Sequence, residues 1–179
     1  LGSTPNFYGI PGLKEHAFTL WSFDDAVRIR EHIKKTFILA AQEKDAEKRM
    51  RLLTFVVAGA GFTGVEMIGE LAVWIKSLCR EHGIPRKDVR LVIIDMLPRI
   101  LSTLNEKNAA KAHEYMEKKL GIEIMTSTKI LEATENGLVV EGGFIQTKTI
   151  IWAAGIRGSV FADRMDVEKV GRSGRISVD

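Results

Sequence analysis

The N-terminal part of the chain has a mainly polar pattern with one long predicted helix. The first twenty residues are rich in proline and glycine, which block a helix and favour turns. Ser22, with acidic residues soon after it, is typical of a helix N-cap. We expect a helix from Phe23 to about Arg49, whose almost wholly polar last part, 42–50, is either a solvated helix or a linker.

The next segment changes from a strand pattern to a helix pattern within a few residues. The run at 52–58 is apolar on both faces, which is typical of a central parallel strand that is covered on both sides. It leads into the glycine-rich segment 59–64. Beyond it, apolar residues recur on one helical stripe before a stop at Gly83, namely Val65, Ile68, Ala72, Ile75 and Cys79.

Shorter elements follow, and their order predicts the fold class. A strand at 89–94 ends at Asp95, and Thr103 and Glu106 have the spacing of a capping box for a helix that Gly121 closes. Further β runs, with hairpin-turn signals at 136–137 and 142–143, lie at 122–125, 130–134, 138–141 and 147–153. The order predicts an α/β fold with a Rossmann-like parallel sheet and an antiparallel β-meander insertion.

Composition excludes several classes of protein. The chain is 45% hydrophobic and 27% charged, which is normal for a globular domain and argues against disorder. Its net charge of +3 is scattered, so we expect no nucleic-acid partner. The single cysteine, Cys79, excludes an internal disulfide, and the four histidines have no metal-ligand spacing, so we expect no metal site. No apolar run approaches the ~18 to 20 residues of a membrane span.

Residues 59–64 have the Gly-x-Gly-x-x-Gly spacing of a dinucleotide-binding turn between a strand and a helix. Gly59 permits the tight turn, Gly61 lets the backbone approach a pyrophosphate, and Gly64 lets the helix pack closely on the strand. The helix N-terminus offers free N–H groups and a positive dipole end to phosphates. We predict cofactor binding by Gly59, Ala60, Gly61, Phe62, Thr63 and Gly64. The alternative is an α/β domain that binds no nucleotide and needs glycine only for a tight turn.

Asp95 ends the strand that follows this turn, where an acidic residue accepts hydrogen bonds from the adenosine ribose. It lies further along the chain than the roughly 20 residues that the motif describes, because the intervening helix and loop are long. A carboxylate there repels a 2′-phosphate, so NAD is favoured over NADP. Arg99 is the alternative signal, since a nearby arginine can accommodate that phosphate.

Several segments together resemble a known family. Residues 58–72, AGAGFTGVEMIGELA, resemble the second nucleotide motif of type II NADH dehydrogenases, which are flavin-containing NADH:quinone oxidoreductases of the pyridine nucleotide-disulfide oxidoreductase superfamily. The resemblance covers nearly the whole chain, because further segments fit in the same order at 6–12, 22–30, 98–101, 151–157 and 174–179.

The resemblance implies how the chain is divided. Residues 1–50 are expected to be a stub of the FAD domain and a linker helix, 51–157 the NADH-binding domain, and 158–179 a segment returning to the FAD domain. The chain begins without Met and ends in a strand-like pattern, so we expect it to be part of a longer protein. The flavin glycine motif and the membrane-binding region of the family are absent from it. The family usually carries Glu where this chain has Asp95.

The resemblance also implies roles for three further residues. Glu66 matches a family Glu near the nicotinamide and the flavin, so it is the candidate catalytic residue; the alternative is that it only complements the helix dipole. Ala154 and Gly155 end a strand with small side chains, which leaves room for the nicotinamide and its ribose. The alternative for them is a packed strand end.

The function that the resemblance implies is the binding of NADH for hydride transfer to FAD, from which electrons pass to a quinone. The complete protein is expected on the cytoplasmic side of a membrane, held at the surface only by sequence absent here, whereas this chain alone is expected to be soluble. A homodimer is left open. Two alternatives remain, another FAD-dependent reductase (sulfide:quinone or ferredoxin reductase) and a non-catalytic NAD(H)-sensing module.

Overall fold

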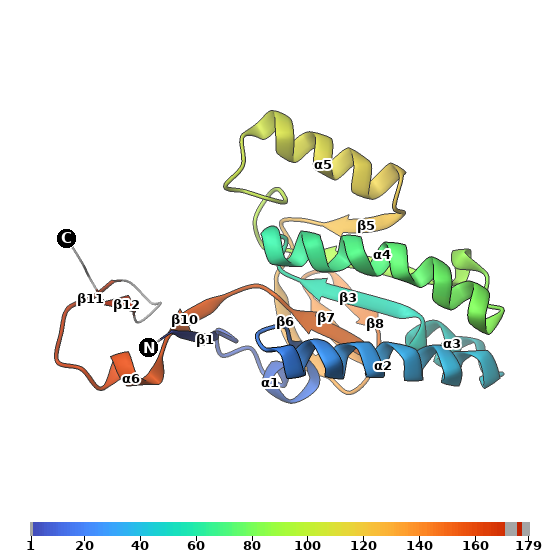
Figure 1. Cartoon of the computed structure of the whole chain (residues 1–179), viewed down its shortest axis with the longest axis horizontal. Helices are drawn as coiled ribbons and strands as arrows, with labels where there is room; N and C mark the ends of the chain where they lie inside the picture. Colours follow the sequence, from blue (N-terminus) through green and yellow to red (C-terminus); the bar gives the residue numbers. More distant parts are fainter. Residues whose placement is uncertain (1, 171–174, 177–179) are drawn as a thin grey trace.

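A five-stranded parallel sheet forms the centre of the molecule (Figure 1). The computed structural model describes residues 2–170 and 175–176. The strands of this sheet lie in the order β2 (Phe18–Thr19), β9 (Thr149–Trp152), β3 (Thr54–Ala58), β4 (Arg90–Ile94) and β5 (Ile122–Met125). Every neighbouring pair is parallel.

Long helices pack on one face of this sheet, and a short helix together with a second, antiparallel sheet covers the other. The helices are α1 (Leu13–His16), α2 (Phe23–Gln42), α3 (Ala46–Leu52), α4 (Phe62–His82), the short 3-10 helix η1 (Arg86–Asp88), α5 (Glu106–Lys118) and α6 (Val160–Asp163). The antiparallel sheet consists of β6 (Ile130–Thr134), β7 (Gly137–Val140) and β8 (Gly143–Gln146). The predicted α/β fold with a parallel sheet and a β-meander insertion is therefore confirmed.

Strand β3 shows why the run at 52–58 is apolar at every position. All five of its residues are buried. Phe55 and Val57 lie in one apolar cluster with residues of α2, α4 and α5. Val56 and Ala58 lie in a second cluster with residues of α1, β6, β7 and β8. Because successive side chains of a strand point to opposite faces, both faces need apolar residues.

Helix α2 begins at the predicted cap. The Ser22 hydroxyl accepts from the Asp25 N–H, and the Asp25 carboxylate accepts from the Ser22 N–H, at 3.1 and 3.0 Å. Burial raises the pKa of Asp25, but the hydrogen bonds from Ser22, Trp21 and Arg28 outweigh it, so its pKa is lower than usual. Inside the helix, Phe37 stacks on Phe55 of β3 with ring centroids 5.9 Å apart.

Three predicted boundaries were wrong. The helix expected to reach Arg49 ends at Gln42, because Asp45 caps a new helix, α3, by accepting from the N–H groups of Glu47 and Lys48. The strand predicted at 52–58 therefore starts at Thr54. Helix α5 is capped by Asn105, whose side chain accepts from the Asn108 N–H at 2.9 Å, and not by Thr103.

Several short strands were not predicted. β8 begins at Gly143, which the sequence indicated only as part of a hairpin turn. Gly142, with a positive φ of 88°, makes the turn between β7 and β8. The short parallel strand β2 was also missed, because two residues carry no alternation pattern.

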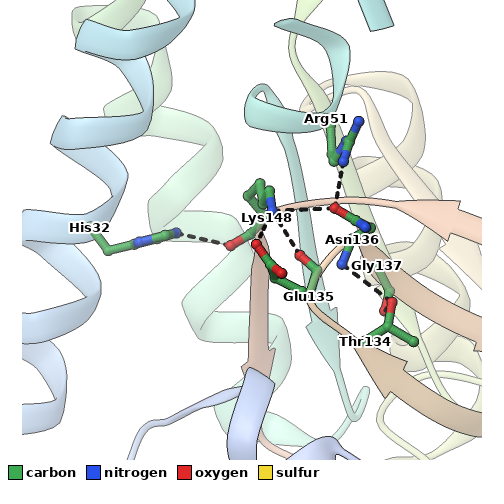
Figure 2. Close-up of polar contacts among 7 residues, drawn as sticks. All are labelled: His32, Arg51, Thr134, Glu135, Asn136, Gly137 and Lys148. Atoms are coloured by element: carbon green, nitrogen blue, oxygen red, sulfur yellow. Dashed lines mark hydrogen bonds and ion pairs between the residues drawn. The ribbon is translucent and has the colours of Figure 1, made fainter. Parts of the chain in front are cut away.

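A polar network joins α2, α3 and the β6–β7 turn to the start of β9 (Figure 2). The His32 ring nitrogen Nε2 lies 3.1 Å from the Lys148 carbonyl, and Lys148 Nζ donates to the Glu135 carbonyl at 3.0 Å and to the Asn136 side chain at 3.3 Å. The Arg51 guanidinium donates to the same Asn136 side chain. These contacts hold the meander against the helical layer at the edge where the parallel strands begin.

Strand β1 (Ser3–Pro5), near the N-terminus, pairs antiparallel with β10 (Ile156–Gly158), and the two form a separate sheet. Beyond β10 the chain extends away from the parallel sheet through α6 to β11 (Lys169–Val170), which pairs with β12 (Arg175–Ile176) (Figure 1). The motif matched at 174–179 lies outside the described residues except for 175–176.

The domain boundary at residues 50 and 51 stays a prediction. Helix α2 lies before that boundary, yet Ile29, Ile33 and Phe37 are buried in the same apolar cluster as β3 and α4. Among the residues that the structure describes, no helix has both the length and the apolar character needed to cross a bilayer.

Candidate functional site

The carboxyl ends of β9, β3 and β4 meet at one edge of the sheet and enclose a cavity of about 640 Å³. That volume is typical of a site for a small organic ligand, and this edge is where open α/β sheets bind ligands. We call it the strand-end cavity. It is lined by Tyr8, Ile10, Gly59, Gly61, Thr63, Ile94, Asp95, Met96, Leu97, Ser102, Thr128, Lys129, Ile130, Trp152, Ala153, Ala154, Gly155 and Ile156.

Gly59 makes the turn out of β3 and allows a close backbone contact. Its φ of +106° is rarely adopted by a residue with a side chain. A Cβ at this position would lie 2.6 Å from the backbone of Ala154. The turn therefore requires glycine both for its conformation and for the approach of the segment after β9.

Gly61 and Gly64 differ in what surrounds them. A Cβ on Gly64 would lie 1.8 Å from the Gly59 carbonyl oxygen, so the close packing of α4 on the turn requires glycine there. A Cβ on Gly61 would meet no described protein atom within 4 Å, and its φ of −73° suits any residue. Packing within the described residues therefore does not explain Gly61, whereas a ligand lying against its backbone would.

The N-terminus of α4 opens beside this space. No described side chain caps the helix, whose N-cap is Gly61. The first N–H groups of a helix have no partner inside it, and the aligned peptide dipoles place partial positive charge there. An anionic group is therefore favoured against the turn at 59–64.

The Asp95 carboxylate is bonded directly to the glycine turn. One of its carboxylate oxygens accepts from the Ala60 N–H at 2.6 Å and the other from the Leu97 N–H at 2.8 Å. The carboxylate thus fixes the position of the glycine turn, and its remaining lone pairs can still accept from a ligand hydroxyl. The predicted contact of Asp95 with a ribose stays a prediction.

Arg99, the alternative signal for a 2′-phosphate, does not line the cavity. Its guanidinium donates to the carbonyl of Ser102 at 2.8 Å. The cationic side chain among the described lining residues is Lys129, whose Nζ lies 3.3 Å from a carboxylate oxygen of Glu141.

Ala154 and Gly155 line the cavity at the end of β9, but the space beside Gly155 is already occupied. A Cβ on Gly155 would lie 2.2 Å from the Tyr8 hydroxyl oxygen and 2.8 Å from its ring. The Tyr8 side chain therefore leaves room only for glycine at position 155. The role predicted for Ala154 and Gly155 in accommodating a nicotinamide stays a prediction.

Four of the predicted site residues, including Ala60, do not line the cavity. Phe62 and Glu66 are exposed on the first turns of α4, and Gly64 is buried beneath the turn. Ala60 contributes through its N–H to Asp95. The catalytic role of Glu66 therefore stays a prediction, because Glu66 could act only on a group that binds outside the cavity lining.

Sequence reasoning missed several lining residues, including Tyr8, Met96, Leu97 and Thr128. Met96 and Leu97 follow β4, and Thr128 lies shortly after β5. Because the carboxyl ends of parallel strands lie at one edge, the residues after each predicted strand were a usable signal for these three. Tyr8 had no such signal, because it lies in a loop that is distant in sequence from the strands that form the cavity.

The described residues hold no group of three or more His, Cys, Asp or Glu side chains that could bind a metal ion. The one cysteine, Cys79, is buried in α4, and burial raises the pKa of its thiol. It is therefore a protonated packing residue at neutral pH.

The two curated relatives described next are similar to this chain and share one name. A type II NADH:quinone oxidoreductase of Staphylococcus saprophyticus is 35% identical over 163 residues, which cover 89% of this chain and 40% of that protein. One from Staphylococcus aureus is 36% identical over the same coverage.

A solved structure of NDH2 from Plasmodium falciparum in complex with NADH is 20% identical, with a TM-score of 0.86 over 92% of this chain and 35% of that one. At this identity the likeness shows the fold. This chain spans about 40% of the length of the curated relatives. The resemblance to type II NADH dehydrogenases noted from the glycine motif is confirmed by the two relatives. The family description that matches residues 1–179 is pyridine nucleotide-disulphide oxidoreductase, and the chain belongs to that family.

Proposed function

We propose that this chain is the NADH-binding part of a flavin-dependent NADH:quinone oxidoreductase and that it holds NADH for hydride transfer to FAD. The observation that carries the proposal is the open space against Gly61, which lies at the uncapped N-terminus of α4 and in the same cavity as the Asp95 carboxylate. This arrangement suits a diphosphate joined to a ribose. The names of the relatives and the NADH complex of the structural neighbour support the same assignment.

The strand order suggests how the ligand lies. The glycine turn follows β3, which lies between β4 and β9. With the pyrophosphate at the turn, Asp95 after β4 receives the adenosine ribose, and the nicotinamide half extends toward Ala154 and the Tyr8 ring that covers Gly155.

The charges favour NADH over NADPH. A 2′-phosphate on the adenosine ribose would lie against the Asp95 carboxylate, which repels it. The guanidinium of Arg99 is held by the Ser102 carbonyl and does not line the cavity. Arg99 therefore supplies no cation to the ribose position, and Lys129 on the cavity wall is paired with Glu141.

These residues bind NADH and orient it. When bound, FAD supplies the two-electron acceptor through which the electrons of NADH reach a quinone. The turn and the N-terminus of α4 hold the diphosphate, and Asp95 holds both the turn and the ribose. Hydride transfer itself needs no general acid or base, so the cavity needs no catalytic triad. Glu66, which is exposed on α4, is proposed to act near the nicotinamide and the flavin, in the handling of NADH or the quinone.

Membrane attachment, the quinone and FAD binding are assigned to sequence outside this chain, and the complete protein is proposed to act on the cytoplasmic side of a membrane.

The second candidate function is a different FAD-dependent reductase of the same family, which the family match also supports. Reconstituting the complete protein and measuring NADH oxidation with a quinone, with sulfide or with ferredoxin distinguishes these reductases. A sensing module would bind NADH and oxidise it with none of them.

The binding proposal is tested by calorimetric titration of the 179-residue chain with NADH and NADPH. We expect NADH to bind more tightly than NADPH. Asp95→Ala should weaken NADH binding by about 10- to 100-fold, the worth of one hydrogen bond to a charged group. Asp166→Ala, which removes an exposed carboxylate far along the chain, is the matched control and should leave affinity unchanged. Equal affinity of Asp95→Ala and the starting chain for both nucleotides would contradict the role of Asp95.

A further inference from the structure

Tyr8 forms one wall of the strand-end cavity although it lies in the loop before α1. The residue is 61% exposed. The hydroxyl donates to the Ala154 carbonyl at 3.4 Å, near the limit for a hydrogen bond. The ring meets Trp152 edge-on, with centroids 6.4 Å apart and planes at 66°. One side of the ring thus contacts protein while the other faces open space.

The loop holds this tyrosine in an unusual backbone conformation. Tyr8 has a φ of +52°, which costs a residue with a side chain about 1–2 kcal/mol. Its N–H donates to the Asn6 side chain at 3.0 Å, and the Asn6 N–H donates to the Gly155 carbonyl at 3.1 Å. The Trp152 Nε1–H donates to the Asn6 carbonyl at 2.9 Å. Contacts with the end of β9 therefore place the ring over Gly155.

The position of the ring identifies the half of the ligand that it would meet. Asp95 lies beyond β4 on one side of β3, and Gly155 lies beyond β9 on the other. If Asp95 receives the adenosine ribose, the opposite half of the dinucleotide approaches Ala154, Gly155 and Tyr8. An exposed aromatic face at that end offers a flat apolar surface to a planar ring.

We propose that Tyr8 is a positioning residue for the nicotinamide half of NADH, whose planar ring packs against the tyrosine ring beside Gly155. This inference rests on the proposed function and goes beyond it by naming a contact for one half of the ligand. The aromatic ring carries the contact, while the hydroxyl only orients the ring through the Ala154 carbonyl. The 3.4 Å length of that hydrogen bond allows the ring to adjust when the ligand binds.

The test compares three ligands on the 179-residue chain by calorimetric titration: NADH, ADP-ribose, which lacks the nicotinamide, and reduced nicotinamide mononucleotide, which lacks the adenosine. Tyr8→Ala should weaken NADH binding by about three- to tenfold, the worth of one aromatic pair contact, and leave ADP-ribose binding unchanged. Reduced nicotinamide mononucleotide should lose affinity by the same factor as NADH. Tyr8→Phe should keep the affinity of the starting chain for all three ligands within about twofold, because it keeps the ring.

Tyr115→Ala is the matched control, because Tyr115 is exposed to a similar extent, 58%, and lies on α5, away from the cavity. It should bind all three ligands as the starting chain does. A thermal unfolding curve of each variant checks that the chain is folded during the titration.

The outcomes separate the two proposals. Equal weakening of NADH and ADP-ribose by Tyr8→Ala overturns the inference, because it indicates a merely structural role of Tyr8. Unchanged NADH binding in Tyr8→Ala overturns it as well. If the starting chain binds neither NADH nor ADP-ribose, the proposed function itself fails. Tight ADP-ribose binding with no effect of Tyr8 on NADH leaves the proposed function standing and removes only the inference.

Discussion

Replacing Gly61 by alanine should separate ligand binding from folding. The added Cβ meets no described protein atom within 4 Å, and the φ of −73° is favourable for alanine. Alanine restricts the unfolded chain more than glycine does, which stabilises the folded protein by about 0.4–1 kcal/mol. Alanine is also a poorer N-cap than glycine, which destabilises the folded protein by a few tenths to about 1 kcal/mol. These effects nearly cancel, so the free energy of unfolding should stay within about 1 kcal/mol of the starting chain.

Ligand binding should respond very differently to the same change. If a diphosphate lies against the backbone at Gly61, the new methyl group occupies its place and displaces it from the N–H groups of α4. Losing even one hydrogen bond to a charged group costs about 1.5–3 kcal/mol, so NADH affinity should fall by about 10- to 100-fold or more. Calorimetric titration with NADH measures this loss.

Gly69→Ala is the control for this substitution. Gly69 lies in the interior of α4, and a Cβ there also meets no described atom within 4 Å. Alanine in a helix interior is favoured over glycine by about 0.8–1.0 kcal/mol, so the midpoint of thermal unfolding should rise by about 2–4 °C. NADH binding should not change. Full NADH affinity in Gly61→Ala would refute the placement of a diphosphate at this turn.

Two further predictions concern stability. Gly64→Ala should lower the free energy of unfolding by at least about 1–3 kcal/mol in urea titrations, because its Cβ would lie 1.8 Å from the Gly59 carbonyl; a variant as stable as the starting chain contradicts the packing described for α4. Burial lowers the pKa of His32 below its usual 6.5, with a further lowering by Lys35, so the unfolded chain takes up a proton more readily and stability is lost as pH falls below about 6.5. His32→Gln should therefore show a smaller loss of stability than the starting chain between pH 7.5 and 5.5, and equal losses would show that His32 does not cause the dependence.

The periodicity and the caps within the chain were sufficient to predict much of the fold. The burial of the stripe at Ile68, Ala72, Ile75 and Cys79 was predictable, because helical spacing alone determines which side chains share a face. The capping box at Ser22 is likewise a local feature. The cap at Asn105 was missed, because Thr103 and Asn105 are both capable of capping and only the path of the chain after β4 selects one.

The sequence by itself determined the strand, the glycine turn and the following helix, because the conformational needs of glycine and the change of apolar period act over a few residues. It also placed Asp95 at the end of a strand, and hence at the ligand-binding edge of the sheet. Only the tertiary structure decided that Asp95 holds the Ala60 N–H, that Ala154 approaches Gly59, and that Tyr8 covers Gly155. Each of these contacts joins residues far apart in the chain, so it depends on how the strands and loops pack, which no local pattern encodes.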